Sequence, residues 1–185
     1  MDSIELLGAL IGLVFIFLEY RASQWLWVAG IIMSLFYIYI WYQADCIAWA
    51  LIYLYYLGAN IFGIIVWLKN SEDNSGSGIS NLPKKYYPIL CTLVVCLSII
   101  IYIIIYKFTE TKIPVSESFS TALSVIGMWL LAKKYLQHWN VWMIVNPLTA
   151  LGSLYLGLYF SAAMFTVFSV VSIMGFVRWR KLAGK

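Results

Sequence analysis

The sequence has little charge. Asp, Glu, Lys and Arg make up 11% of its 185 residues, whereas 63% of the residues are hydrophobic and the mean hydropathy is +0.88. A soluble domain usually has about 25% charged and about 45–50% apolar residues, so a soluble protein is excluded. Seven membrane spans of about 20 residues would leave only about 45 positions for loops. A separate catalytic domain is therefore excluded as well.

Residues that carry enzyme chemistry are also few. His138 is the only histidine, and Cys46, Cys91 and Cys96 form neither a CxxC motif nor a Cys/His cluster. The sequence contains no HExxH, GxSxG, P-loop or GxGxxG motif. We therefore expect no enzyme activity, no cofactor and no metal site. The net charge of +4 comes from basic residues between apolar runs, which does not favour a nucleic-acid partner.

Long apolar runs, separated by short polar breaks, dominate the sequence instead. Each run is long enough to cross a bilayer as a helix. The expected spans are 4–20, 23–42, 47–68, 88–106, 118–134, 138–158 and 161–179. The sequence thus predicts an all-α integral membrane protein with seven transmembrane helices. Its expected parts are a three-helix bundle at 1–68, a cytoplasmic linker at 69–87, a helix with an external loop at 88–117 and a second three-helix bundle at 118–185.

The basic residues predict the orientation in the membrane. Lys107 and Lys112 would lie on one side, and the other ten Lys and Arg residues on the opposite side. Because Lys and Arg gather in cytoplasmic loops, these ten residues belong inside the cell. We expect the amino terminus outside and the carboxyl terminus in the cytoplasm.

The two three-helix bundles match when the sequence is shifted by 112 positions. The shift aligns Arg21 with Lys133, Trp27 with Trp139, Ala50 with Ala162, Tyr56 with Phe168, Gly63 with Gly175 and Trp67 with Trp179. One register that holds over such a distance indicates an internal duplication. The odd helix at 88–106 would make the two repeats parallel, a 3+1+3 plan like that of SWEET sugar transporters.

Polar residues inside the spans align under the same shift. Ser34 falls on Asn146, and Asn60 falls on Ser172. Transporters built from parallel repeats bind substrate near the bilayer midplane, so these four side chains are candidate substrate ligands. A single polar residue in a span is more often a hydrogen-bonding link between helices, and this alternative applies to each of the four.

Aromatic residues recur at steps of three and four along the same spans, which places them on the helix faces that carry the polar groups. The candidate walls of the substrate site are Trp49, Tyr53, Tyr56, Trp142, Phe165 and Phe168, with Tyr37 and Thr149 as secondary candidates. Packing between helices is the alternative for such a stripe. Aromatic residues on both sides of a polar group in both repeats favour a site for a flat ligand.

No Asp, Glu, Lys or Arg lies in the middle third of any expected span. Proton-driven carriers normally keep an ionisable group there, so we expect transport down the substrate gradient. Glu19, about one turn from the end of the first span, is the nearest candidate for ion coupling. It could instead be an interfacial partner of Arg21 or Lys133.

Three segments resemble one transporter family. They are LIYLYYLGANIFGIIVW (51–67), MWLLAKKYLQHWNVWMIVNPLTA (128–150) and YFSAAMFTVFSVVSIMGFVRW (159–179). They resemble the bacterial nicotinamide riboside transporter family, PnuC, and the resemblance extends over essentially all seven helices. It implies facilitated diffusion of a vitamin across the bacterial cytoplasmic membrane, with phosphorylation inside the cell trapping the vitamin. It also implies a homo-oligomer.

Departures from the family pattern bear on the substrate. Members that carry nicotinamide riboside usually read Q-x-x-[YF]-x-x-x-[NS]-x-Y-G-W, and this chain has Tyr53 in place of the glutamine and Ile64 in place of the last aromatic residue. The remaining motif positions that match are Tyr56, Asn60 and Gly63. The segment LEYRASQWLW (18–27), with its Glu19-Tyr20-Arg21 sequence, resembles the thiamine-transporting branch, PnuT.

These departures slightly favour thiamine over nicotinamide riboside. Both vitamins are flat cationic heteroaromatic molecules, and an aromatic cage suits either of them through cation–π contacts. The alternatives are a sugar or other small-solute carrier on the same fold, and a membrane scaffold that transports nothing.

Overall fold

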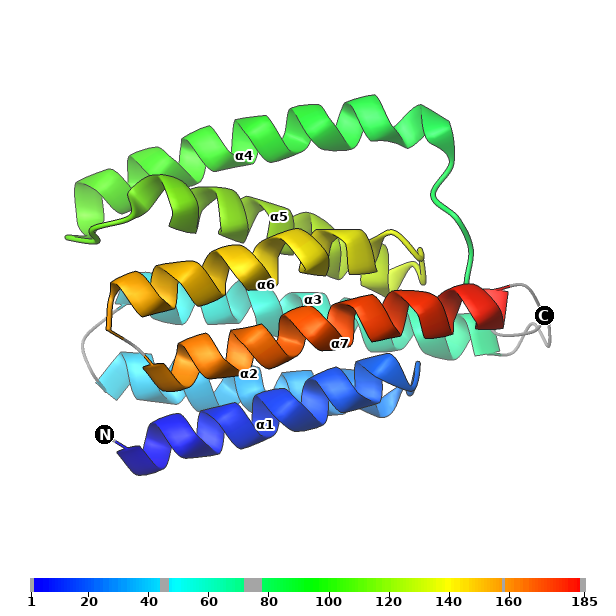
Figure 1. Ribbon diagram of the computed structural model, residues 1–185, viewed down its shortest axis with the longest axis horizontal. Coiled ribbons are helices and arrows are strands. Elements are labelled where there is room, and N and C mark those ends of the chain that lie inside the picture. The colour runs from blue at the N-terminus through cyan, green and yellow to red at the C-terminus, as the bar shows by residue number, and fades with distance from the viewer. Residues whose placement is uncertain (1, 44–46, 72–77, 158, 184–185) are drawn as a thin grey trace. The chain divides into compact units, whose positions relative to one another are not determined.

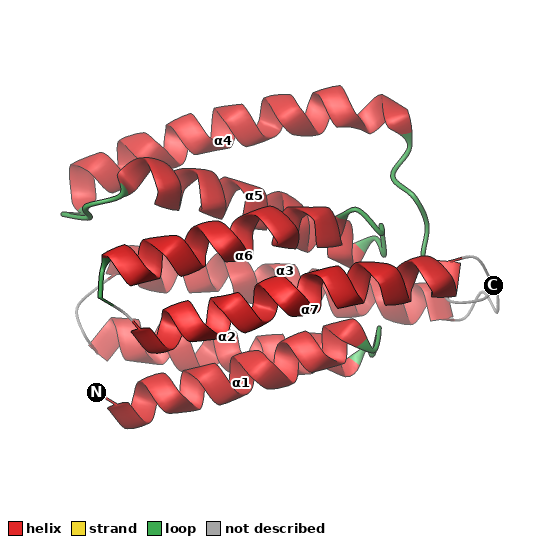
Figure 2. Cartoon of the chain, in the orientation of Figure 1, coloured by secondary structure: helices red, strands yellow, loops and turns green. Residues whose placement is uncertain are grey.

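The computed structural model describes residues 2–43, 47–71, 78–157 and 159–183, with side chains over 10–39, 53–69, 78–157 and 159–183. Cys46 and residues 72–77 of the expected linker lie outside the described residues. The helices are α1 (Asp2–Tyr20), α2 (Trp25–Gln43), α3 (Ile47–Ser71), the short 3-10 helix η1 (Lys84–Tyr86), α4 (Tyr87–Phe108), α5 (Pro114–Ala132), α6 (His138–Tyr155) and α7 (Tyr159–Ala183) (Figures 1 and 2).

The structure confirms the all-α fold with seven long helices, each ending within four residues of its predicted bounds. The start of α5 and the end of α7 differ most from the predicted bounds. Helix α5 begins earlier because Pro114 takes the first turn, where its fixed φ suits a helix and its missing N–H is not needed. In the part of the chain that the structure describes, α4 with η1, α5 and α7 are long and apolar enough to cross a membrane. Shorter apolar stretches lie at Leu10–Tyr20, Trp25–Tyr39 and Tyr53–Lys69.

The chain forms two compact units, Met1–Gly78 (unit 1) and Ile79–Lys185 (unit 2). In unit 1, α2 packs mainly against α3, and α1 packs against α2. The α2–α3 contact contains the buried rings of Trp27 and Trp67, which meet edge to face with 5.6 Å between their centroids. Gly63 allows this contact, because a Cβ at this position would overlap the Trp27 ring.

In unit 2, α6 packs mainly against α7, and α5 contacts both α4 and α6. The α6–α7 contact contains Trp139 and Trp179, again edge to face, at 5.9 Å. A Cβ at Gly175 would overlap the Trp139 ring. Leu82, Ile126 and Leu130 form a buried cluster that joins the segment before α4 to α5.

The 112-residue shift therefore relates contacts as well as residue types. The tryptophan pairs and their glycines are equivalent under it, and so are the turns that end α1 and α5. In the first turn, the N–H of Ala22 donates to the Glu19 carbonyl and that of Ser23 to the Leu18 carbonyl. The equivalent bonds after α5 run from Lys134 to Leu131 and from Tyr135 to Leu130. How the repeats are related across the membrane stays a prediction.

These turns have the hydrogen bonds of a Schellman motif, which usually places glycine in the left-handed position. Here the position is held by Ala22 (φ 52°) and Lys134 (φ 53°). A residue with a Cβ is about 1–2 kcal/mol less stable than glycine in this conformation. Part of this difference is offset because alanine has less conformational entropy than glycine in the unfolded chain.

We expect Ala22→Gly to raise the free energy of unfolding by about 0.5–1 kcal/mol. Chemical unfolding of the purified protein in detergent measures it.

Ala29→Gly, in the interior of α2, is the control for this prediction. It should lower the free energy of unfolding by about 1 kcal/mol. A similar loss in both variants would contradict the strain assigned to Ala22.

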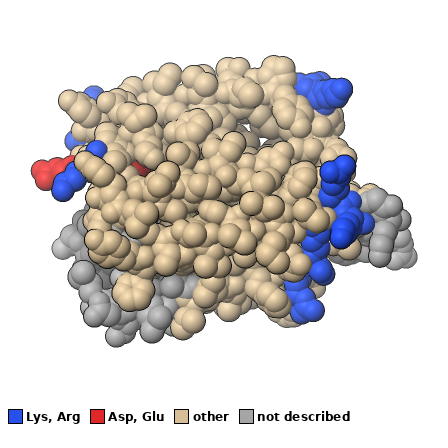
Figure 3. Space-filling model, in the orientation of Figure 1, with Lys and Arg blue, Asp and Glu red and all other residues tan. Residues whose placement is uncertain are grey.

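Most of the basic residues of unit 2 gather at one end of its helices, and Lys107 and Lys112 lie at the other end. Lys133 and Lys134 follow α5, and Arg178, Arg180 and Lys181 lie in the last turns of α7. We call this the basic end of unit 2. Its only carboxylate side chains, those of Glu110 and Glu117, lie between α4 and α5 and in the first turn of α5. Figure 3 shows most of the visible Lys and Arg at one end of the helices.

The basic end predicts the orientation of the protein, because cytoplasmic loops collect Lys and Arg. A reporter fused after Lys185 is expected to be active only in the cytoplasm, and one placed before Met1 only outside the cell. Activity of the Lys185 fusion outside the cytoplasm would reverse the predicted topology.

Candidate functional site

In unit 1, the candidate ligands Ser34 and Asn60 lie together between α2 and α3. Each side chain is 3% exposed. The Asn60 amide donates from Nδ2 to the Tyr56 carbonyl at 2.7 Å and, more weakly, to Ser34 Oγ at 3.4 Å. The Ser34 hydroxyl donates to the Gly30 carbonyl at 2.8 Å. Each side chain thus donates to the carbonyl four residues earlier in its own helix. The bond from Asn60 to Ser34 joins α3 to α2.

The Asn60 amide oxygen is the unusual atom of this pair. Within the part of the chain that the structure describes, Oδ1 is buried and accepts no hydrogen bond. It lies against Gly30, where a Cβ would overlap it. An unsatisfied buried acceptor costs about 1–3 kcal/mol, so this oxygen is a candidate partner for a ligand donor.

In unit 2, Asn146 and Ser172 form the equivalent pair between α6 and α7, with the amide and the hydroxyl exchanged between the helices. Asn146 Nδ2 donates to Ser172 Oγ at 2.9 Å, and Ser172 donates to the Phe168 carbonyl at 2.7 Å. Both residues are buried. In each unit the predicted polar residues are thus brought together as one amide–hydroxyl pair.

Three candidate tyrosines lie close together in unit 1. Tyr37 of α2 stacks on Tyr53 of α3 with 4.7 Å between centroids and 15° between ring planes. Tyr53 lies 5.9 Å from Tyr56, whose carbonyl accepts the Asn60 bond. All three rings are partly exposed. They form an aromatic surface next to the Ser34–Asn60 pair.

The equivalent positions in unit 2 are Thr149, Phe165 and Phe168. The two phenylalanine rings meet edge to face at 5.8 Å, and Thr149 donates to the Val145 carbonyl at 2.9 Å. Trp142 packs over Gly127 of α5, its ring 3.1 Å from where a Cβ would lie. Trp142 therefore contributes to the α5–α6 contact.

The remaining sequence candidates are Trp49 and Glu19. The Trp49 side chain lies outside the described residues. Glu19 is 1% exposed in the last turn of α1. Its burial is consistent with a structural role at the helix end, and it stays a candidate for ion coupling.

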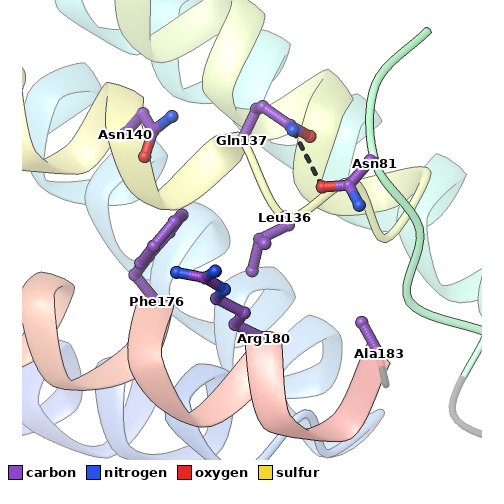
Figure 4. Close-up of a pocket in the computed structure, with 7 residues that line it drawn as sticks. All are labelled: Asn81, Leu136, Gln137, Asn140, Phe176, Arg180 and Ala183. Atoms are coloured by element: carbon purple, nitrogen blue, oxygen red, sulfur yellow. Dashed lines mark hydrogen bonds between the residues drawn. The ribbon is translucent and has the colours of Figure 1, made fainter. Parts of the chain in front are cut away.

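A polar pocket at the basic end of unit 2 was missed from sequence. Asn81, Gln137, Asn140 and Arg180 line it together with apolar side chains (Figure 4). Its residues come from the segment before α4 and from the ends of α6 and α7. No spacing rule joins these segments, although a row of amides beside basic residues at helix ends was a usable signal.

Comparison with known proteins gives one consistent family. Residues 2–181 match the family described as nicotinamide mononucleotide transporter. Proteins named nicotinamide riboside transporter PnuC, from Escherichia coli (strain K12) and Shigella flexneri, are each 20% identical over 95% of this chain and 84% of their own length. The crystal structure of the vitamin B3 transporter PnuC matches with a TM-score of 0.76 at 16% identity, covering 99% of this chain and 83% of that one.

The match to the solved structure supports the same fold, and the family match covers nearly the whole sequence. The apolar helices agree with a multi-pass membrane protein, and the relatives are transporters rather than enzymes. This chain therefore belongs to the nicotinamide mononucleotide transporter family and is a membrane transporter.

Proposed function

We propose that this transporter carries a flat cationic vitamin into the bacterial cell by facilitated diffusion, with phosphorylation inside the cell trapping the vitamin. The observation that carries the proposal is the arrangement found in each unit, a buried amide–hydroxyl pair next to partly exposed aromatic rings. Amides supply both donors and acceptors, and aromatic faces attract a cationic ring.

The distribution of charge supports transport without ion coupling. Within the described residues, the Asp, Glu, Lys and Arg residues of the helices lie near helix ends, as with Glu19 in the last turn of α1 and Glu117 in the first turn of α5. Proton-driven carriers usually place such a group at mid-membrane. The vitamin would then move only down its own gradient. A homo-oligomer stays a prediction.

Nicotinamide riboside is the first candidate vitamin, because the relatives carry its name. Thiamine is the second, and Tyr53 favours it. Tyr53 occupies the position where the nicotinamide riboside motif has glutamine. Its ring stacks on Tyr37 and offers a ring face in place of an amide. Such a surface suits a second aromatic ring better than it suits a carboxamide.

Tyr53→Gln tests this assignment. It removes the stacked ring and restores an amide, so it is expected to shift preference toward nicotinamide riboside by about ten-fold, the value of one good hydrogen bond. The measurement is the ratio of the two dissociation constants in wild type and variant. An unchanged ratio would show that position 53 does not select the vitamin.

A thermal-shift screen of the purified protein tests the vitamin class. A ligand that binds the folded state raises the melting temperature in proportion to ln(1 + [L]/Kd). The panel contains nicotinamide riboside, thiamine, riboflavin and sugars. Stabilisation by nicotinamide riboside or thiamine supports the proposal. Stabilisation by a sugar alone would favour a small-solute carrier, and no response to any compound would favour a scaffold.

A further inference from the structure

The pocket at the basic end of unit 2 is separate from the amide–hydroxyl pair and has a different chemistry. It has a volume of about 410 Å³ and is lined by the polar side chains of Asn81, Gln137, Asn140 and Arg180, with Phe176 among its apolar residues. Figure 4 shows these side chains converging from the segment before α4 and from α6 and α7. The volume falls within the range of small-molecule sites.

One wall of the pocket is fixed by hydrogen bonds. Gln137 accepts from the Leu82 N–H at 2.8 Å and donates to Asn81 Oδ1 at 3.1 Å. Beside it, the Ser80 N–H donates to the Lys134 carbonyl at 3.1 Å, and the Leu136 N–H donates to the Ser80 carbonyl at 2.9 Å. Because Asn81 uses its oxygen in this wall, its amide N–H groups are available to a ligand.

The charge around the pocket is positive. Arg180 forms no ion pair or hydrogen bond with any other described residue. The carboxylates of unit 2, Glu110 and Glu117, lie at the far end of α5. Helix α6 begins at His138, so the positive end of its dipole lies beside Asn140. An anionic ligand would meet the Arg180 cation and amide donors here, and no Asp or Glu side chain lies near the pocket among the described residues of unit 2.

We propose that this pocket binds an anionic phosphate group. The Arg180 guanidinium matches phosphate with two parallel N–H donors, and the amides of Asn81 and Asn140 add neutral donors. Phe176 supplies an apolar wall beside the group. The phosphate could belong to a soluble phosphate ester or to the headgroup of an anionic phospholipid, since the pocket lies at the ends of apolar helices.

Two arms of one experiment distinguish these sources. In detergent, the melting temperature of the full-length protein is measured with inorganic phosphate and with chloride at equal ionic strength. In nanodiscs, it is measured in phosphatidylglycerol and in phosphatidylcholine. A higher melting temperature in phosphate than in chloride indicates that the ligand is a soluble phosphate. A higher melting temperature in phosphatidylglycerol alone indicates a lipid headgroup. In either case Arg180→Gln should remove the gain, which in the phosphate arm means at least a ten-fold weaker apparent affinity.

Lys181→Gln is the matched control, because it removes one positive charge from the adjacent position of α7 without changing a residue that lines the pocket. It should keep the gain. Asn140→Ala, at an exposed position, gives a second test if Arg180→Gln does not fold, and it should weaken the gain. The proposal is overturned if neither arm shows a rise in melting temperature that depends on Arg180 and Asn140. It is also overturned if Lys181→Gln reduces this rise as much as Arg180→Gln does.

Discussion

Asn146→Leu is expected to weaken vitamin binding by roughly ten-fold or more while the protein stays folded and inserted in the membrane. The reason is that a hydrogen bond to a charged or desolvated ligand contributes about 1.5–3 kcal/mol, whereas bonds between membrane helices average only about 0.6 kcal/mol. Losing the 2.9 Å bond to Ser172 should therefore cost little stability. Asn60→Leu should behave in the same way.

The control for the asparagine variants is Thr166→Val in α7. Thr166 donates only within its own helix, to the Ala162 carbonyl at 2.8 Å, so its loss should change neither affinity nor stability appreciably. Isothermal titration gives the dissociation constants, and thermal unfolding gives the stabilities. If both asparagine variants keep wild-type affinity and only lose stability, the pairs are links between helices and not substrate ligands.

Gly63→Ala and Gly175→Ala are expected to destabilise the protein by about 1–3 kcal/mol each, the usual range for overpacking. An added methyl group would overlap the ring of Trp27 in unit 1 or that of Trp139 in unit 2. These rings are fully buried between two helices, so they have no open space into which to move. The free energy of unfolding in detergent measures the loss.

Gly58→Ala is the matched control for the glycine variants, because it lies in the same helix as Gly63 and a Cβ there meets no atom within 4 Å among the described residues. Alanine is the better helix former by about 1 kcal/mol, so this variant should be neutral or more stable. Equal effects of Gly58→Ala and Gly63→Ala would show that the tryptophan layer is not tightly packed.

The helices were predictable because long apolar runs have few other solutions in a membrane. The 112-residue shift also identified which polar and aromatic residues are equivalent. It could not show that Asn60 and Asn146 turn toward a serine within their own unit, because this depends on the rotation of each helix about its axis. Trp142 shows the same limit, since its ring packs on Gly127 of α5.

Other features depend on contacts that local patterns do not contain. The turns after α1 and α5 lack the expected glycine, and Ala22 and Lys134 take the left-handed conformation instead. The pocket at the basic end of unit 2 exists because Gln137 binds residues 81 and 82, more than fifty positions away in sequence. Such long-range pairs follow from the folded chain and not from its periodicity.

Uptake into proteoliposomes is the most direct test of the proposal that this transporter moves a vitamin by facilitated diffusion. Labelled nicotinamide riboside and thiamine are supplied outside vesicles that have no proton or sodium gradient. We expect one of them to enter until the inside and outside concentrations are equal, and to exchange with unlabelled vitamin already inside. Uptake of neither vitamin, or accumulation above the outside concentration that requires an ion gradient, would contradict the proposal.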